Sequence, residues 1–152
     1  METQAITFTL DIDPQGEARG RATAIGGHAR IYTPKKTRAY RAQVAALAEP
    51  YRPAEPLSGS LAVEIVATFA RPAYMRRRSK RTGELLGGWP ERPFPKTSKP
   101  DTDNVAKAVL DALNTWWGDD AQVSDLRIRK RWASADGCGS VQVTISPDCG
   151  DT

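Results

Sequence analysis

Two pairs of aspartates stand out in a chain that is basic overall. Asp101 and Asp103 are two residues apart, Asp119 and Asp120 follow further along the same segment, and Lys107 lies between the pairs. Carboxylates that converge without His or Cys form a hard, all-oxygen site, and such a site selects Mg²⁺ or Mn²⁺ over zinc. The segment therefore predicts a divalent-cation site with a lysine beside it.

A helix is expected from about residue 102 to 114, and it would position most of these side chains. Its apolar residues fall on one stripe, while Asp103, Lys107 and Asp111 form an i, i+4, i+8 ridge on a more exposed face. Asp101 has the type and place of an N-cap residue. Both aspartates of the first pair then project near the helix N-terminus, where the helix dipole and the lysine offset part of their repulsion.

A purely structural interpretation of the same residues is also open. Aspartates at helix starts are common caps, Asp103 and Lys107 form an ordinary stabilising pair, and two consecutive aspartates are common in turns. The interpretations differ in whether the chain after the helix brings Asp119 or Asp120 toward the first pair. If it does, the carboxylates make one site.

Positive charge is concentrated in one segment of the 152-residue chain, which has a net charge of +4. Residues 71–100 hold nine of the 22 Lys and Arg but only two of the 18 Asp and Glu, which leaves 13 basic and 16 acidic residues elsewhere. Prolines and glycines in this segment argue against regular structure, so a long basic loop is expected. Such a cluster favours a polyanionic partner, and nucleic acid is the usual one.

An acidic cation site beside a basic loop suggests metal-assisted cutting of a phosphodiester. The cation would polarise the phosphate and lower the pKa of an attacking water, and Lys107 would offset charge on the transition state or the leaving oxygen. The alternative is a DNA-binding module without catalysis, for which the basic loop would be enough. A pure binder gains nothing from carboxylates that face phosphate, because they repel it.

The remaining pattern predicts one α+β domain over residues 1–152, with a small mixed sheet and two main helices in the order β-β-α-β-α-β-β. The expected elements are strands at 5–12, 30–33, 60–70, 125–133 and 140–146, and helices at 35–49 and 102–114. Residues 13–30 are rich in glycine and charge and are expected to be a loop. The last two strands are expected to form a hairpin around residues 134–139.

Composition argues against a membrane or disulfide-rich protein. No apolar run of about 18 residues exists, and the N-terminus lacks the basic start and apolar core of a signal peptide. The two cysteines, Cys138 and Cys149, have no metal-ligand spacing and are expected to be free thiols in a reducing cytoplasm.

The acidic segment resembles the signature of the RusA family of Holliday-junction resolvases, which occur in bacteria and in their phages and prophages. The stretches that carry the resemblance are KPDTDNVAKAVLDALN at 99–114 and DDAQVSDLRIRK at 119–130. They share an Asp-x-Asp-Asn start, a lysine four residues after the second aspartate, Asp-Ala-Leu, and Asp-Asp-Ala-Gln-Val before a basic strand. The resemblance is close over about 99–131 and looser over 30–48.

The resemblance implies a homodimeric, Mg²⁺-dependent crossover junction endodeoxyribonuclease, with Mn²⁺ as a substitute, that nicks four-way branched DNA symmetrically in recombination and repair. It implies metal-binding carboxylates at Asp101, Asp103 and Asp120, and an essential Lys107, with Asp119 as the alternative member of its pair. A dimer also has a physical rationale, because a four-way junction has near two-fold symmetry and a C2 dimer presents two matching sites. An endonuclease for forks or flaps is the alternative within the same chemistry, and the expected location is the cytoplasm of a bacterium or of a phage host.

Candidate DNA contacts come from the basic loop and from the strand at 125–133. They are Arg76, Arg77, Arg78, Lys80, Arg81, Lys96, Lys99, Arg127 and Arg129. The loop residues either contact phosphate or form a solvated loop. Arg127, Arg129 and Arg131 alternate, so they share one strand face, which either lines the DNA path or faces solvent. Three loop aromatics either stack on exposed bases or anchor the loop: Tyr74, Trp89 and Phe94.

Overall fold

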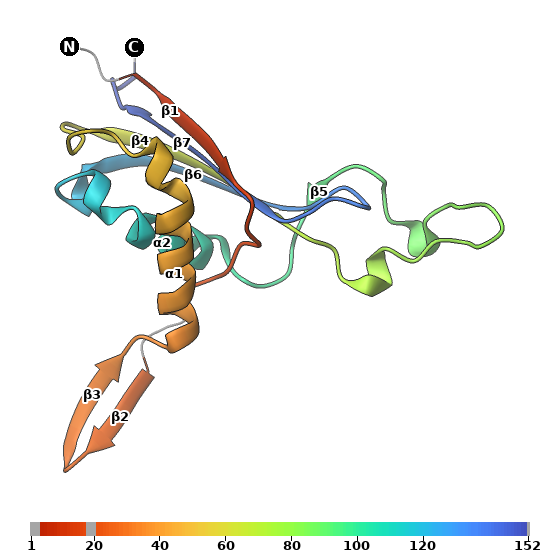
Figure 1. Ribbon diagram of the computed structural model, residues 1–152, viewed down its shortest axis with the longest axis horizontal. Coiled ribbons are helices and arrows are strands. Elements are labelled where there is room, and N and C mark those ends of the chain that lie inside the picture. Colours follow the sequence, from red (N-terminus) through yellow and green to blue (C-terminus); the bar gives the residue numbers. More distant parts are fainter. Residues whose placement is uncertain (1–3, 18–20, 152) are drawn as a thin grey trace.

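The computed structural model describes residues 4–17 and 21–151 (Figure 1). The main sheet has five strands in the order β1-β7-β4-β6-β5, and a separate sheet consists of β2 and β3. The strands are β1 Ile6–Leu10, β2 Arg21–Ile25, β3 His28–Tyr32, β4 Leu61–Phe69, β5 Phe94–Pro95, β6 Val123–Trp132 and β7 Ser140–Pro147. The two α-helices are α1 Lys35–Ala48 and α2 Thr102–Ala112. The fold is a single-domain α+β fold with a mixed sheet, as the sequence predicts.

The centre of the main sheet is β4, which pairs with β6 in parallel and with β7 in antiparallel orientation. The expected hairpin of the last two strands is therefore wrong, because β4 lies between them. The strand pattern explains its place: every second residue from Leu61 to Phe69 is buried and the residues between are half-buried. One face of β4 is thus fully buried, the other is partly covered, and both of its edges are paired, as is typical of a central strand.

Helices α1 and α2 lie on one side of the main sheet (Figure 1), and the core fills the space between. Tyr40 and Val44 of α1 and Val109 of α2 are fully buried there. Burying a Val or Leu side chain stabilises the fold by about 1.5–3 kcal/mol. The helix expected to end at 114 ends at Ala112 and is followed by a 3₁₀ turn at Asn114–Trp116. This packing fixes the exposed face of α2, which carries the acidic ridge.

The opposite face of the main sheet is not covered by α1 or α2. The β4–β6 register aligns Glu64 with Arg127 and Val66 with Arg129 on this face. The neighbouring register pairs on the helix side, Val63 with Leu126 and Ile65 with Ile128, point the other way because successive side chains alternate along a strand.

Residues 21–32 form a β-hairpin that projects from the N-terminal end of α1 (Figure 1). The expectation of a loop over 13–30 is wrong for this part, while residues 18–20 lie outside the described residues. The turn consists of Gly26 and Gly27 at φ +59° and +78°. Two-residue hairpin loops favour glycine because both positions adopt positive φ.

The segment between β4 and β5 forms an arm, which we define as residues 70–93. It projects away from the end of the sheet (Figure 1) and contains two short 3₁₀ turns, Ala73–Met75 and Leu86–Gly88. The expectation of little regular structure is confirmed, although many of its side chains have fixed partners, as described below. In the part of the chain that the structure describes, no helix is long and apolar enough to cross a membrane.

Candidate active site

An open groove of about 400 Å³ runs between α2 and β6. We call it the acidic groove and define it by the charged residues that line it: Asp103, Lys107, Asp111 and Asp120. Its remaining lining residues are Thr102, Ala106, Leu110, Leu126 and Ile128. Leu126 and Ile128 of β6 face α2, because successive side chains alternate between the two faces of the strand. The groove thus sets charged side chains of two separate segments above an apolar floor.

Asp103 and Asp120 reach the acidic groove from different elements. Asp103 lies in the first turn of α2, and Asp120 begins a 3₁₀ turn at Asp120–Gln122, just before β6. The Trp117 indole Nε1 donates a hydrogen bond of 3.0 Å to Asp120 Oδ1. Because Trp117 is buried in the core, this bond fixes the direction of the carboxylate.

The neighbouring Asp119 has a structural task. Its side chain accepts a hydrogen bond of 2.8 Å from the Ala121 amide, and its own amide donates to Gln122 Oε1 at 2.9 Å. These two bonds form a capping box on the 3₁₀ turn. Gln122 also donates through Nε2 to the carbonyl groups of Leu57 and Gly59. The turn is therefore tied to the body of the domain, and only Asp120 of the pair lines the acidic groove.

Asp101 occupies the N-cap position of α2, as expected, but its side chain makes no capping hydrogen bond. It lines a second pocket of about 560 Å³, together with Lys36 and Lys99. Lys130 Nζ donates to the carbonyl groups of Ser98 and Pro100 at 2.7 and 2.6 Å. This lysine holds the chain that enters α2 and so fixes the place of Asp101 beside the acidic groove.

The carboxylates of the acidic groove bear on whether a divalent cation could bind there. Among residues 4–17 and 21–151, no three His, Cys, Asp or Glu side chains are grouped closely enough to hold a metal ion together. Mg²⁺ needs fewer protein ligands, since it usually keeps several waters and is bound by one or two carboxylates and substrate phosphates. Asp103 and Asp120, both exposed in one open groove, have the donor chemistry for such a site.

Lys107 is held by a chain of charged side chains. Its Nζ lies 3.1 Å from Asp111 Oδ2, and Arg41 Nη2 of α1 lies 3.0 Å from the same oxygen. Arg41 also forms an ion pair with the buried Glu17. The lysine is therefore paired with Asp111 and not with Asp103, which leaves the latter carboxylate outside this chain of contacts.

Four of the residues expected to contact DNA have other roles or positions, and one of them, Arg78, is paired with Glu91 and Asp136 in the arm. Lys96 is only 7% exposed, and its Nζ lies 4.1 Å from the centre of the Trp132 ring. Burial lowers its pKa, and the nearby Lys130 lowers it further. The expectation of a surface contact is wrong for Lys96, because the aromatic rings of β4 and β6 cover it. Arg127 and Arg129 lie on the uncovered face of the sheet, within 4 Å of Asp125 and Glu64 respectively.

Other candidate DNA contacts are exposed, namely Arg76, Arg77, Lys80, Arg81 and Lys99. Sequence reasoning missed four residues that position the acidic groove: Glu17, Arg41, Trp117 and Lys130. Of these, only Lys130 could have been found from the sequence. Alternation along β6 places it on the face opposite Arg127 and Arg129, which is the face toward α2. Arg41 binds Asp111, 70 residues away, and Glu17, 24 residues away, so no local pattern shows these contacts, and nothing in the sequence marks the Trp117 indole as the donor to Asp120.

A comparison with known proteins gives matches that extend over almost all of these elements. The family model described as endodeoxyribonuclease RusA matches residues 11–146, which include both helices, the arm and the acidic groove. The uncharacterized protein YqaN of Bacillus subtilis (strain 168) is 31% identical over 126 residues, which span 82% of this chain and 86% of that protein.

Proposed function

The chain belongs to the RusA endodeoxyribonuclease family, and we propose that it is a Mg²⁺-dependent, structure-selective nuclease that resolves Holliday junctions by paired symmetric nicks. The observation that carries the proposal is the meeting of Asp103, Asp120 and Lys107 in one open groove. A DNA binder without catalysis would gain nothing from two exposed carboxylates in this place, because they repel phosphate.

Asp103 and Asp120 are the proposed ligands of the cation in the acidic groove. Asp101, at the N-cap of α2, lines the neighbouring pocket and would become a third ligand only after a movement that brings it toward the other two. When bound there, Mg²⁺ would polarise the scissile phosphate and lower the pKa of an attacking water. The Trp117 hydrogen bond to Asp120 supports this assignment, because a carboxylate fixed in direction loses less conformational freedom when it binds. Mn²⁺ is expected to substitute for Mg²⁺, since both prefer oxygen ligands.

Lys107 is the proposed cationic group beside the reacting phosphate. An ammonium aimed at developing negative charge stabilises the transition state more than the ground state. Asp111 accepts a hydrogen bond from Lys107 and is itself held by Arg41. The lysine therefore meets the substrate with part of its conformational freedom already lost. Lys36 and Lys99 line the pocket beside Asp101 and are suited to a neighbouring phosphate.

The proposed active form is a homodimer on four-way DNA. One chain carries one acidic groove, and a paired cut needs two grooves related by the near two-fold axis of the junction. The chain is proposed to act in DNA recombination and repair, where such junctions arise.

One assay tests the proposal. Labelled four-way junction, matched linear duplex and fork are each incubated with the protein in Mg²⁺, Mn²⁺ or EDTA. Paired nicking of the junction in Mg²⁺ and Mn²⁺, and none in EDTA, is the expected result. If the fork is cut in preference to the junction, the main substrate is another form of branched DNA and not the four-way junction. Binding without cutting on every substrate would sink the nuclease assignment.

A further inference from the structure

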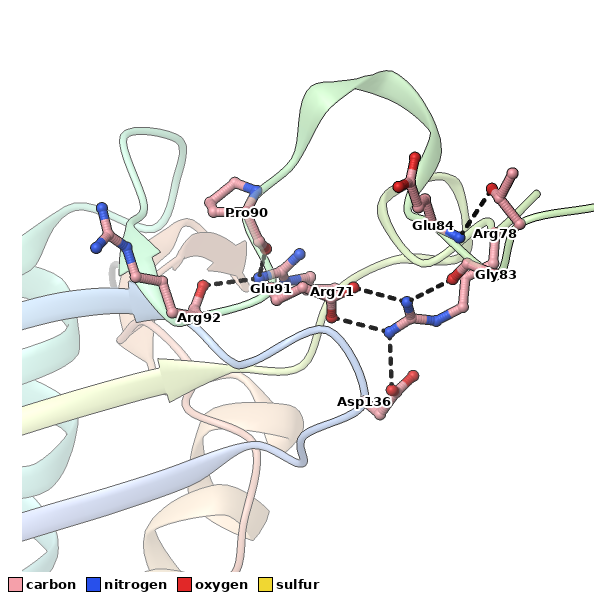
Figure 2. A network of polar contacts seen from close by, with 9 residues as sticks. Arg71, Arg78, Gly83, Glu84, Pro90, Glu91, Arg92 and Asp136 are labelled. Atoms are coloured by element: carbon pink, nitrogen blue, oxygen red, sulfur yellow. Dashed lines mark hydrogen bonds and ion pairs between the residues drawn. The ribbon is translucent and has the colours of Figure 1, made fainter.

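The base of the arm is fixed by one buried arginine. Arg71 is 2% exposed, and its Nε donates to the Ala133 carbonyl at 2.7 Å. Its Nη2 donates to the carbonyl groups of Pro90 and Arg92 at 2.6 and 2.9 Å (Figure 2). The guanidinium also lies 5.0 Å from the centre of the Phe94 ring. One side chain thus joins both ends of the arm to the loop between β6 and β7.

A second arginine fixes the middle of the arm. Arg78 forms a two-pronged ion pair with Glu91, at 2.7 and 3.0 Å, and a further pair with Asp136 at 2.9 Å (Figure 2). Its Nη1 also donates to the Gly83 carbonyl at 3.0 Å. The hydrogen bonds from Arg78 lower the pKa of Glu91, so this carboxylate stays charged and paired. The guanidinium of Arg78 therefore donates its hydrogen bonds within the protein, which is not the role of a phosphate contact expected for it.

The aromatic residues divide into anchors and an exposed ring. Trp89 stacks on Phe94 with 6.1 Å between ring centres, and Tyr74 meets the edge of Trp89 at 6.4 Å. A side chain at Gly87 would collide with the Trp89 ring, which shows how closely the arm backbone packs on it. Tyr74, by contrast, is 58% exposed.

Four of the exposed cations of this arm lie within six residues of one another: Arg76, Arg77, Lys80 and Arg81. All four are exposed, and none has an ion pair with any residue that the structure describes. The acidic residues Glu91 and Asp136 are already paired with Arg78. The arm thus presents a preformed, mainly positive surface, on which the exposed Glu84 is the carboxylate not paired with Arg78.

We propose that the arm is a preformed docking lobe for the sugar-phosphate backbone of a duplex arm of branched DNA, with Arg78 as the lock that folds it. The inference rests on the proposed function for the identity of the nucleic acid. Exposed Arg and Lys without partners suit sequence-independent phosphate contacts. A lobe that is ordered before binding loses less conformational entropy on docking than a mobile loop does. The exposed ring of Tyr74, two residues before Arg76 in the arm, offers an apolar contact for sugar or base.

The test measures binding of an uncut four-way junction in EDTA at several salt concentrations. Arg76→Gln with Arg77→Gln is compared with Arg38→Gln with Arg52→Gln, a matched pair that makes the same charge change at two exposed arginines outside the arm. Each phosphate contact contributes about 0.9 to the slope of log K against log salt, so the arm variant should lose up to about 1.8 of that slope. The control should keep the wild-type slope. An equal loss in both variants would mean a general charge effect and would overturn the lobe.

The lock is tested separately by limited proteolysis of the full chain. Arg78→Gln should make the arm sensitive to protease and weaken junction binding, whereas the Arg76 and Arg77 variant should keep a resistant arm. A resistant arm in Arg78→Gln would overturn the role of the lock. If the arm variant loses affinity for an acidic polypeptide but keeps its affinity for junction DNA, the partner is a protein and the proposal fails. If the wild-type chain binds through the arm but never cuts, the proposed nuclease fails and the lobe stands.

Discussion

Lys107 and Asp111 are joined across one turn of α2, with 3.1 Å between Nζ and Oδ2. Arg41 reaches the same oxygen from α1 and is itself paired with the buried Glu17. An exposed i, i+4 pair by itself contributes only about 0.3–0.5 kcal/mol. The pair matters because of its position: it holds Lys107, the lysine that lines the acidic groove, beside the contact between α1 and α2.

Asp103→Asn and Lys107→Ala should each reduce junction cutting by at least about 100-fold, since each removes a charge that is proposed to act on the reacting phosphate. Junction binding should remain, because the basic residues of the arm are untouched. Single-turnover cleavage and binding in EDTA separate the two quantities. Normal cutting by either variant would remove that residue from the site.

Asp111→Asn should slow cutting by about 10- to 100-fold, because a displaced lysine stabilises the transition state less well. Binding and thermal stability should change little, so the loss appears in the cleavage rate and not in KM. Arg41→Gln should give a smaller loss in the same direction. Asp125→Asn serves as the control, since this carboxylate pairs with Arg127 away from the groove. A parallel fall in stability and rate for Asp111→Asn would mean that Asp111 only supports the fold.

Substitutions of the consecutive residues Asp119 and Asp120 should have different effects on cutting and on stability. Asp120→Asn should lose cutting with little loss of stability, because it changes a groove carboxylate. Asp119→Ala should lower the free energy of unfolding by about 1 kcal/mol and retain cutting, because it removes a cap. Asp119→Asn should retain both properties, since Asn caps as well as Asp. Denaturant unfolding and cleavage on the same samples check the assignment, and an inactive Asp119→Asn would reverse it.

Arg71→Gln should destabilise the arm by roughly 2–5 kcal/mol, because buried hydrogen bonds from a charged donor contribute about 1.5–3 kcal/mol each and three carbonyl groups lose their partner. Hydrogen exchange of the arm amides reports the effect locally. Arg76→Gln, an exposed change in the same arm, should leave exchange as it is. Unchanged protection in Arg71→Gln would show that Arg78 and the aromatic contacts hold the arm without Arg71.

Local patterns predicted most of the secondary structure. The apolar alternation of β4 and the helical stripe of α2 are properties of short segments, and both elements were placed within a few residues of their observed bounds. The hairpin at 21–32 was missed although Gly26 and Gly27 form a favoured two-residue turn, because its strands lack a strong apolar alternation. The position of β4 between β6 and β7 depends on pairing between distant segments, which no local pattern carries.

The candidate site shows the same division. Sequence alone placed Asp103, Lys107 and Asp111 on one ridge, because their spacing fixes it. It did not show that Arg41 joins this ridge, or that Asp136 helps to lock Arg78, since these partners are 70 and 58 residues apart. The burial of Lys96 was equally hidden, because it depends on two aromatic rings from different strands.

The parallel pairing of β4 with β6 also sets an order of events during folding. The two strands are neighbours in the sheet, but the arm and α2 lie between them in the chain, so a long loop must close before they pair. Asp120 reaches α2 only when β6 has docked. Because Arg71 donates to the Ala133 carbonyl and Arg78 pairs with Asp136, the arm is also fixed only after the chain beyond β6 has been made, so the arm and the acidic groove are completed at the same stage of synthesis.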